Sequence, residues 1–213
     1  DTLVLEDLEE SGFSLVDRRK RLDFEQSLLV LKSLADFHAA SVALYIEDQR
    51  YVESFGEGHY NESTYSSVKA FTDQTFEALI SNVEKWEGFE RFVSKLDKLT
   101  EKAPDIMIEQ IKPKKGEISV LNHGDVWVNN LMFKYFQNNR KPQDVRFVDF
   151  QLSRFTSPAI ELQFFFYLSV HEDVIFQRLD ELVEEYHSAL KSCLKDYGCD
   201  PNLIALSKLK QEL

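Results

Sequence analysis

The feature that most constrains the fold is a change of hydrophobic period in the middle of the chain. The run ISVLNHGD, residues 118–125, is a short apolar stretch that ends in polar residues, which is typical of a buried strand followed by a loop. Two further runs, LMFKY and VRFVDF, are separated by the turn-rich connector FQNNRKPQ and predict a β-hairpin. The sequence therefore predicts a small β insertion, at about residues 117–151, in a chain otherwise patterned for helices.

Helical spacing dominates on both sides of this insertion. Asp23 precedes Phe24 and Gln26 in the manner of a capping box, and apolar residues then recur every three or four positions to about Ile46. His38 lies on this apolar face, where a core histidine with satisfied hydrogen bonds is the simplest interpretation. The pattern predicts an α+β, mostly helical fold, with helices at about residues 24–46, 63–84, 88–98, 103–111, 158–170 and 174–196 and a last one from Pro201.

Composition argues against several classes of partner. The 213 residues carry a formal net charge of −12, which repels phosphate backbones and anionic lipids, so neither nucleic acid nor a membrane is an expected partner. No uninterrupted apolar run approaches the roughly 18 residues that a membrane span needs. Cys193 and Cys199 are close enough in sequence to pair, but two cysteines in a chain of this length are more typical of a reducing compartment, so a cytoplasmic location is expected.

Polar residues at the strand ends of the insertion suit phosphoryl transfer. Transfer of phosphate from ATP to a hydroxyl needs a carboxylate that orients the attacking oxygen and accepts its proton, and it needs oxygen ligands for magnesium. Asp125 and Asn130 can be turned toward one pocket by a single short loop, and Asp149 at the end of the second hairpin strand can lie beside that loop. The pattern predicts Asp125 as the catalytic base, His123 as its support in the catalytic loop, and Asn130 and Asp149 as magnesium ligands.

Other interpretations of these residues stay open. Any one of Asp125, Asn130 and Asp149 alone could be a loop cap, because Asn and Asp favour turns. A zinc site is disfavoured, since His123 has no other His or Cys near it between residues 60 and 170. The three residues taken together favour catalysis.

The same residues resemble known kinases. HGDVWVNN resembles the His-x-Asp-x-x-x-x-Asn catalytic loop of aminoglycoside phosphotransferase-like kinases, and VDFQ resembles their metal-binding Asp-Phe-Gly segment. The longer string NHGDVWVNNLMFKY…DVRFVDFQLSRFTSPAIEL is more similar to the ecdysteroid kinase-like family, also called the choline-kinase-like family of insects. LVLEDLEESGF near the start is similar to the hinge between two kinase lobes, and LADFHAASVAL is similar to a helix beneath the active site.

The resemblance implies ATP and Mg²⁺ as cofactors and assigns the same roles to the catalytic-loop residues. It also implies that backbone groups near Glu6, Asp7 and Leu8 face adenine. Glu161 stands in SPAIEL where the family more often has aspartate. Its longer carboxylate is a candidate brace for the catalytic loop.

The resemblance also predicts the domain organisation. No phosphate-covering loop and no phosphate-pairing lysine precede the hinge-like residues. The expected structure is the C-terminal lobe of a protein kinase-like, aminoglycoside phosphotransferase-like fold without its N-terminal lobe. It would comprise a hinge segment at residues 1–13 and a helical lobe at residues 14–213 that carries the catalytic-loop hairpin. Such an incomplete kinase domain is expected to bind ATP poorly alone.

The expected function is ATP- and magnesium-dependent transfer of the γ-phosphate to a hydroxyl of a small alcohol. The resemblance leaves the acceptor open among an ecdysteroid, choline and other small alcohols. The alternative is a catalytically inactive binding or scaffold module derived from a kinase. The intact set of Asp125, Asn130 and Asp149 favours the enzyme.

Overall fold

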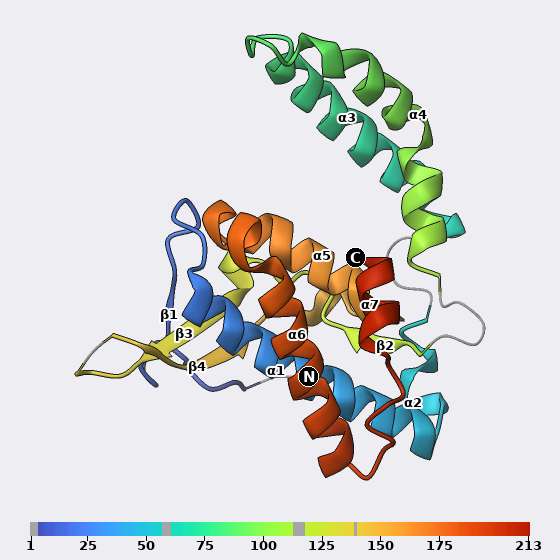
Figure 1. The fold of residues 1–213 in the computed structure, drawn as a ribbon. Helices are drawn as coiled ribbons and strands as arrows, with labels where there is room; N and C mark the ends of the chain where they lie inside the picture. Colours follow the sequence, from blue (N-terminus) through green and yellow to red (C-terminus); the bar gives the residue numbers. More distant parts are fainter. Residues whose placement is uncertain (1–3, 57–60, 113–117, 139) are drawn as a thin grey trace. The chain divides into compact units, whose positions relative to one another are not determined.

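The protein is described here by a computed structural model that places residues 4–56, 61–112, 118–138 and 140–213. Its contacts divide the chain into two units, which are Asp1–Gly56 with Pro113–Leu213, and Glu57–Lys112. Residues 1–3 of the predicted hinge segment, and residues 117 and 139 of the predicted insertion, lie outside the described residues. All the candidate site residues belong to the first unit, which combines helices with two small sheets (Figure 1).

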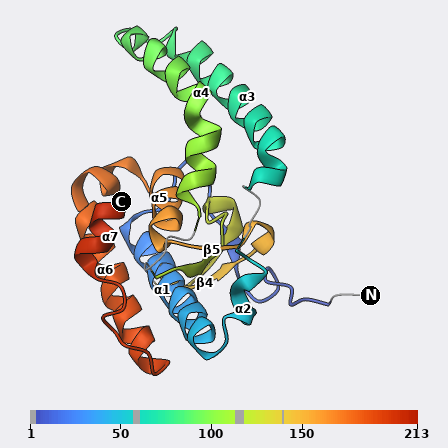
Figure 2. The same ribbon diagram turned by 90° about the vertical axis from the view of Figure 1, so that its right-hand side faces the viewer.

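The core of the first unit is built on two long helices that lie side by side (Figures 1 and 2). Helix α1, Phe24–Glu47, begins at the predicted capping box: the Asp23 carboxylate accepts from the Gln26 backbone N–H, and the Gln26 side chain accepts from the Asp23 N–H. Helix α6, Glu172–Asp196, packs along α1 and is kinked at Arg178. Their buried apolar faces belong to one core cluster.

Helix α1 is apolar enough to cross a membrane by length and composition alone, because an 18-residue window in it has a mean hydropathy of 1.4. That window is 44% buried inside the structure, and the core helix of a soluble protein satisfies the same criterion. Three polar side chains on the buried face of α1, Ser27, His38 and Ser41, form hydrogen bonds within the unit. This packing is that of a core helix.

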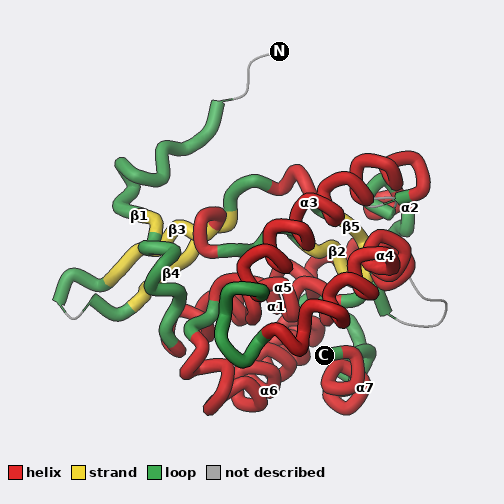
Figure 3. Tube along the Cα trace, turned by 90° about the horizontal axis from the view of Figure 1, so that it is seen from above, coloured by secondary structure: helices red, strands yellow, loops and turns green. Residues whose placement is uncertain are grey.

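The predicted β-hairpin is present. Strands β3, Leu131–Tyr135, and β4, Pro142–Phe147, are antiparallel with Leu131 opposite Phe147. Strand β1, Ser14–Leu15, pairs with β3 and completes a sheet of order β1-β3-β4. A second sheet pairs β2, Val120–Asn122, with β5, Arg154–Thr156, and Figure 3 shows the two sheets apart from each other.

The remaining helices of the first unit are α2, Arg50–Glu53, α5, Pro158–Ser169, and α7, Leu206–Glu212. Helix α5 begins where Pro158 predicts, after Ser157, whose Oγ caps the helix by accepting from the Ala159 N–H. The prediction of a last helix from Pro201 is wrong by five residues. Residues 201–205 form turns, because the Asp200 carboxylate accepts from the Asn202 N–H and His187 Nε2 binds the Ile204 carbonyl. The two cysteines are free.

The second unit is a pair of helices, each preceded by a short 3-10 turn. Helix α3, Tyr65–Val83, follows η1, Glu62–Thr64, and α4, Val93–Gln110, follows η2, Glu90–Phe92. The prediction of two short helices at 88–98 and 103–111 is wrong, since one helix runs through Pro104. Pro104 is buried with Ala103 and Ile108, and packing of this face against α3 outweighs the backbone hydrogen bond that proline cannot donate.

Candidate active site

The loop between β2 and β3 carries the candidate catalytic residues and is anchored by apolar side chains. Val126 and Val128 are buried in the core, whereas Asp125 between β2 and these anchors is half-buried. The loop turns through η3, Val128–Asn130, where the Asn130 N–H donates to the Trp127 carbonyl at 2.8 Å. The loop therefore has a fixed backbone in which a partly exposed acid precedes two buried valines.

Glycine is required at position 124 of this loop. Gly124 has φ +88°, and a Cβ built on it would lie 2.0 Å from the carbonyl oxygen of Leu152. Leu152 belongs to η4, Phe150–Leu152, directly after Asp149. The absence of a side chain at Gly124 is what lets the catalytic loop approach the segment that carries Asp149.

Asp125 and Asn130 are brought together as predicted. The Asn130 Nδ2 donates to the Asp125 Oδ2 at 2.9 Å and to the Asp125 carbonyl at 3.0 Å. These two bonds fix the direction of the Asp125 carboxylate. They also assign the amide nitrogen of Asn130 to Asp125, so its Oδ1 is the atom suited to a cation.

The backbone beside Asp149 is joined to the catalytic loop by two hydrogen bonds. The Val148 N–H donates to the Asn130 carbonyl at 3.1 Å, and the His123 Nε2 lies 3.0 Å from the Val148 carbonyl. Asp149 itself is exposed and has a left-handed backbone, φ +69° and ψ +66°, which aspartate tolerates better than most residues. Its Oδ2 accepts from the Gln151 amide at 3.1 Å. The register of the hairpin thus brings Asp149 to the end of the catalytic loop, as the sequence predicts.

His123 is a structural support in this arrangement. It is 1% exposed, and its ring lies 4.3 Å from that of Phe150 between centroids. The Asp125 N–H donates to His123 Nδ1, and the Val148 carbonyl must accept from Nε2–H, so the two partners together require the neutral Nε2–H tautomer. His123 therefore joins the two loops, and both of its ring nitrogens have backbone partners.

Glu161 on α5 supports the catalytic loop by accepting hydrogen bonds from its backbone. The sequence had only suggested this role. Its carboxylate, 1% exposed on α5, accepts from the His123 N–H at 2.9 Å and from the Gly124 N–H at 2.7 Å. His38 Nε2 lies 2.9 Å from the same carboxylate. Burial raises the pKa of Glu161, but the hydrogen bond and charge of His38 and the two backbone N–H groups outweigh it and leave that pKa below its usual value.

The predicted adenine-facing segment forms a turn beside the hairpin. The Asp7 Oδ1 accepts from the Glu9 and Glu10 N–H groups, and the Leu8 carbonyl accepts from the Phe13 N–H at 2.9 Å. Glu6 and Asp7 are exposed and Leu8 is half-buried. Because β1 follows this turn and contacts η3, the segment lies near the end of the catalytic loop.

The residues present fit magnesium by their donor chemistry. Among the described residues no group of three or more His, Cys, Asp or Glu side chains is placed to hold a metal ion. Magnesium, however, takes hard oxygen ligands, with only one or two carboxylates from the protein. The Asn130 Oδ1 and the exposed Asp149 carboxylate are ligands of this kind.

A mostly helical α+β unit, with an acid-and-amide loop held against a hairpin, is compatible with a kinase-like fold. Residues 1–199 match the family model described as Ecdysteroid kinase-like family. The chain belongs to the ecdysteroid kinase-like family, which confirms the resemblance found in its motifs. A search of curated proteins finds no match. Family membership indicates a kinase-like small-molecule phosphotransferase.

Proposed function

We propose that this protein transfers the γ-phosphate of ATP to the hydroxyl of a small alcohol, with magnesium as cofactor. The observation that carries the proposal is the hydrogen bond between Asp125 and Asn130. A backbone hydrogen bond from Val148, the residue before Asp149, to the Asn130 carbonyl joins this pair to the second acid. An acid fixed in direction, an amide oxygen and a second acid on the neighbouring segment are the groups that this reaction uses.

In the proposed reaction the hydroxyl oxygen of the acceptor bonds to the γ-phosphorus as the bond from that phosphorus to the bridging oxygen breaks. ADP leaves with the bonding electron pair, and the hydroxyl proton passes to the Asp125 carboxylate. Asn130 and Asp149 would hold magnesium, which neutralises phosphate charge when bound. The protein contributes positioning and charge stabilisation.

The test is ADP formation by the full-length protein against a panel of steroid and amino alcohols. Asp125→Asn keeps the size of the side chain and an oxygen that can accept from Asn130, but it removes the base. We expect turnover to fall by about 10²–10⁴-fold with little change in the KM for ATP. Asp144→Asn is the matched control, because Asp144 is a partly exposed acid on β4 paired with Arg146.

Full turnover in Asp125→Asn would reject the assignment of the base. Binding of ATP without ADP formation, for every acceptor in the panel, would instead support the alternative of a catalytically inactive module derived from a kinase.

A further inference from the structure

Three buried side chains, Tyr186, His38 and Glu161, are joined by hydrogen bonds in a series that leads from helix α6 to the catalytic loop. This series is called the relay below. Tyr186 on α6, His38 on α1 and Glu161 on α5 are each at most 1% exposed. The Tyr186 hydroxyl lies 2.7 Å from His38 Nδ1, and His38 Nε2 lies 2.9 Å from Glu161 Oε2. Glu161 then accepts from the N–H groups of His123 and Gly124. The chain thus ends on the two residues that precede Asp125.

The direction of the hydrogen bonds in this chain follows from its last member. Glu161 accepts from two backbone N–H groups, so it acts as an ionised acceptor and His38 must donate from Nε2–H. The other ring nitrogen of His38, Nδ1, lies against the Tyr186 hydroxyl, which is its hydrogen-bond partner. Each polar atom in the chain has a partner in this arrangement, which a buried polar group requires.

We propose that Tyr186 is a positioning residue of the phosphotransferase, acting on Asp125 through His38, Glu161 and the backbone of the catalytic loop. This inference rests on the proposed function for its effect on turnover, but its effect on the loop does not. Without the hydroxyl, the buried Nδ1 of His38 has no hydrogen-bond partner, so the ring that donates to Glu161 is no longer held from its other side.

The expected consequence is a catalytic loop that opens more often while the core stays packed. Phenylalanine fills the volume of Tyr186, whose ring lies among the buried apolar residues of α1 and α6. The hydrogen bond from His38 Nε2–H to the Glu161 carboxylate then weakens. The hydrogen bonds from the His123 and Gly124 N–H groups to the same carboxylate weaken with it. Asp125 would then spend less time in its reactive position, whereas the expected adenine-facing residues Glu6, Asp7 and Leu8 share no hydrogen bond with these three side chains in the described part of the chain.

The first measurement is amide hydrogen exchange at His123 and Gly124 in wild type and in Tyr186→Phe. We expect exchange at these two amides to be at least about tenfold faster in the variant, because it reports opening of the bonds to Glu161. Amides in the middle of α1 should keep their wild-type rates, which shows that the core remains folded.

Tyr135→Phe is the matched control, since Tyr135 also loses one hydrogen-bonded hydroxyl, 2.8 Å from the Gln26 side chain, outside the relay. It should leave exchange at His123 and Gly124 unchanged. Unchanged exchange at both amides in Tyr186→Phe, or equal acceleration in Tyr135→Phe, would overturn the proposal even if the protein is an active kinase.

The second measurement separates the relay from the proposed function. In the full-length protein, Tyr186→Phe should lower kcat for ADP formation by about 5–30-fold with the KM for ATP within twofold of wild type. A parallel rise in KM would contradict positioning through Asp125. If wild type forms no ADP with any acceptor, the proposed function fails, while the exchange result still decides whether Tyr186 positions the loop.

Discussion

The catalytic loop and the α3–α4 helix pair use their polar side chains in opposite ways. In the loop, side-chain hydrogen bonds join segments far apart in sequence, such as Glu161 with Gly124 and His123 with Val148. In the helix pair, hydroxyl and amide side chains bond carbonyls four residues back on their own helix, as in Thr75, Asn82 and Thr100.

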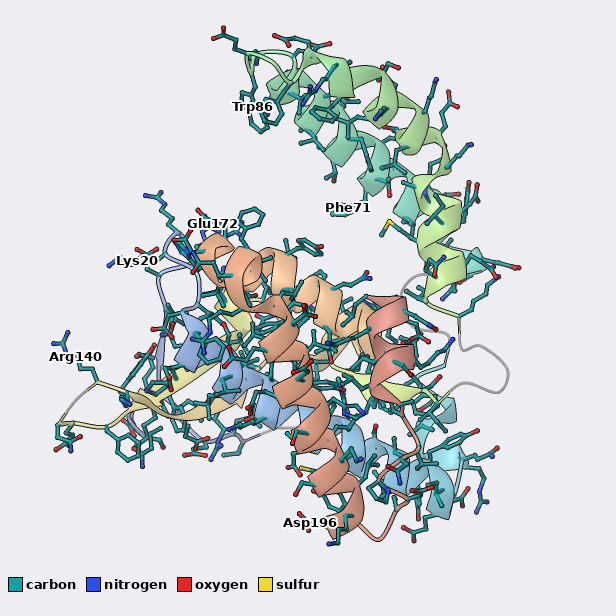
Figure 4. The ribbon with its side chains drawn as sticks, viewed as in Figure 1. Lys20, Phe71, Trp86, Arg140, Glu172 and Asp196 are labelled. Carbon is teal, nitrogen blue, oxygen red and sulfur yellow. The ribbon has the colours of Figure 1, made fainter. Side chains whose placement is uncertain are left out.

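Exposure separates the polar residues that hold the loop from the large aromatic residues of the helix pair. Asn130, His123 and Glu161 are all less than 10% exposed, whereas Phe71 of the helix pair is 61% exposed and Trp86 is 50% exposed. Figure 4 shows the side chain of Phe71 projecting from α3 and that of Trp86 projecting from the connection after α3. A substitution in the loop should therefore disturb several elements at once, whereas a substitution on the exposed face of the helix pair should remain local.

The largest effect is expected at the glycine of the catalytic loop. Gly124→Ala places a methyl group against the Leu152 carbonyl and also forces a left-handed backbone on alanine. We expect a loss of about 2–5 kcal/mol in the free energy of unfolding, from overpacking and backbone strain together. The displaced Asp125 should lower turnover by about 10²-fold or more. Urea unfolding and ADP formation measure the two effects.

Gly88→Ala in the helix pair is the matched control. Gly88 has φ +81°, similar to Gly124, but a Cβ there meets no atom within 4 Å. Only the backbone strain of about 1–2 kcal/mol should remain, and turnover should be unchanged. Equal effects of the two substitutions would show that the close approach at Leu152 does not matter.

A smaller effect is expected for Glu161→Gln. The amide can present one oxygen to the loop, so either the His123 or the Gly124 N–H faces an NH₂ group and loses its acceptor. We expect a loss of about 1–3 kcal/mol in the free energy of unfolding at neutral pH, the cost of one unsatisfied buried donor. Urea unfolding at neutral pH measures it.

The pH dependence of stability gives a second measure of Glu161. Its folded pKa lies below the ordinary value of 4.5, so its contribution is fully present above pH 4.5 and is lost as the pH falls through the folded pKa. Wild type should therefore lose stability in acid below that value more steeply than Glu161→Gln. Parallel acid-unfolding curves for the two proteins would contradict an ionised Glu161 in the native state.

Local signals made part of this structure predictable from sequence. The capping box at Asp23 and the proline at the start of α5 are decided within four residues, and both are found where they were predicted. The hairpin follows from two apolar runs with a turn-rich connector, and its register carries Asp149 to Asn130. Elements determined by neighbours in sequence are the ones that periodicity and turn chemistry can find.

Contacts between distant residues were beyond the sequence. His38 is more than 100 residues away in sequence from both Glu161 and Tyr186. The local pattern around each of these residues therefore shows a helix face but not which residues it contacts. The prediction of two short helices in place of α4 was wrong for the same reason. Packing against α3 outweighs the helix-breaking effect of Pro104. The sequence signals of the relay were His38, a polar residue on an apolar helix face, and the Glu161 carboxylate in SPAIEL.

The smallest effect is expected on the exposed face of the helix pair. Phe71→Ser exchanges residues of similar helix propensity at a position that is already 61% exposed. The local unfolding free energy of α3, measured by amide hydrogen exchange, should change by no more than about 0.5 kcal/mol. Val68→Ser, one turn earlier and 2% exposed, is the matched control and should cost about 1–3 kcal/mol. If Phe71→Ser destabilised α3 as much as Val68→Ser, the exposed aromatic face would be part of a packed interface, and the contrast between the helix pair and the catalytic loop would not hold.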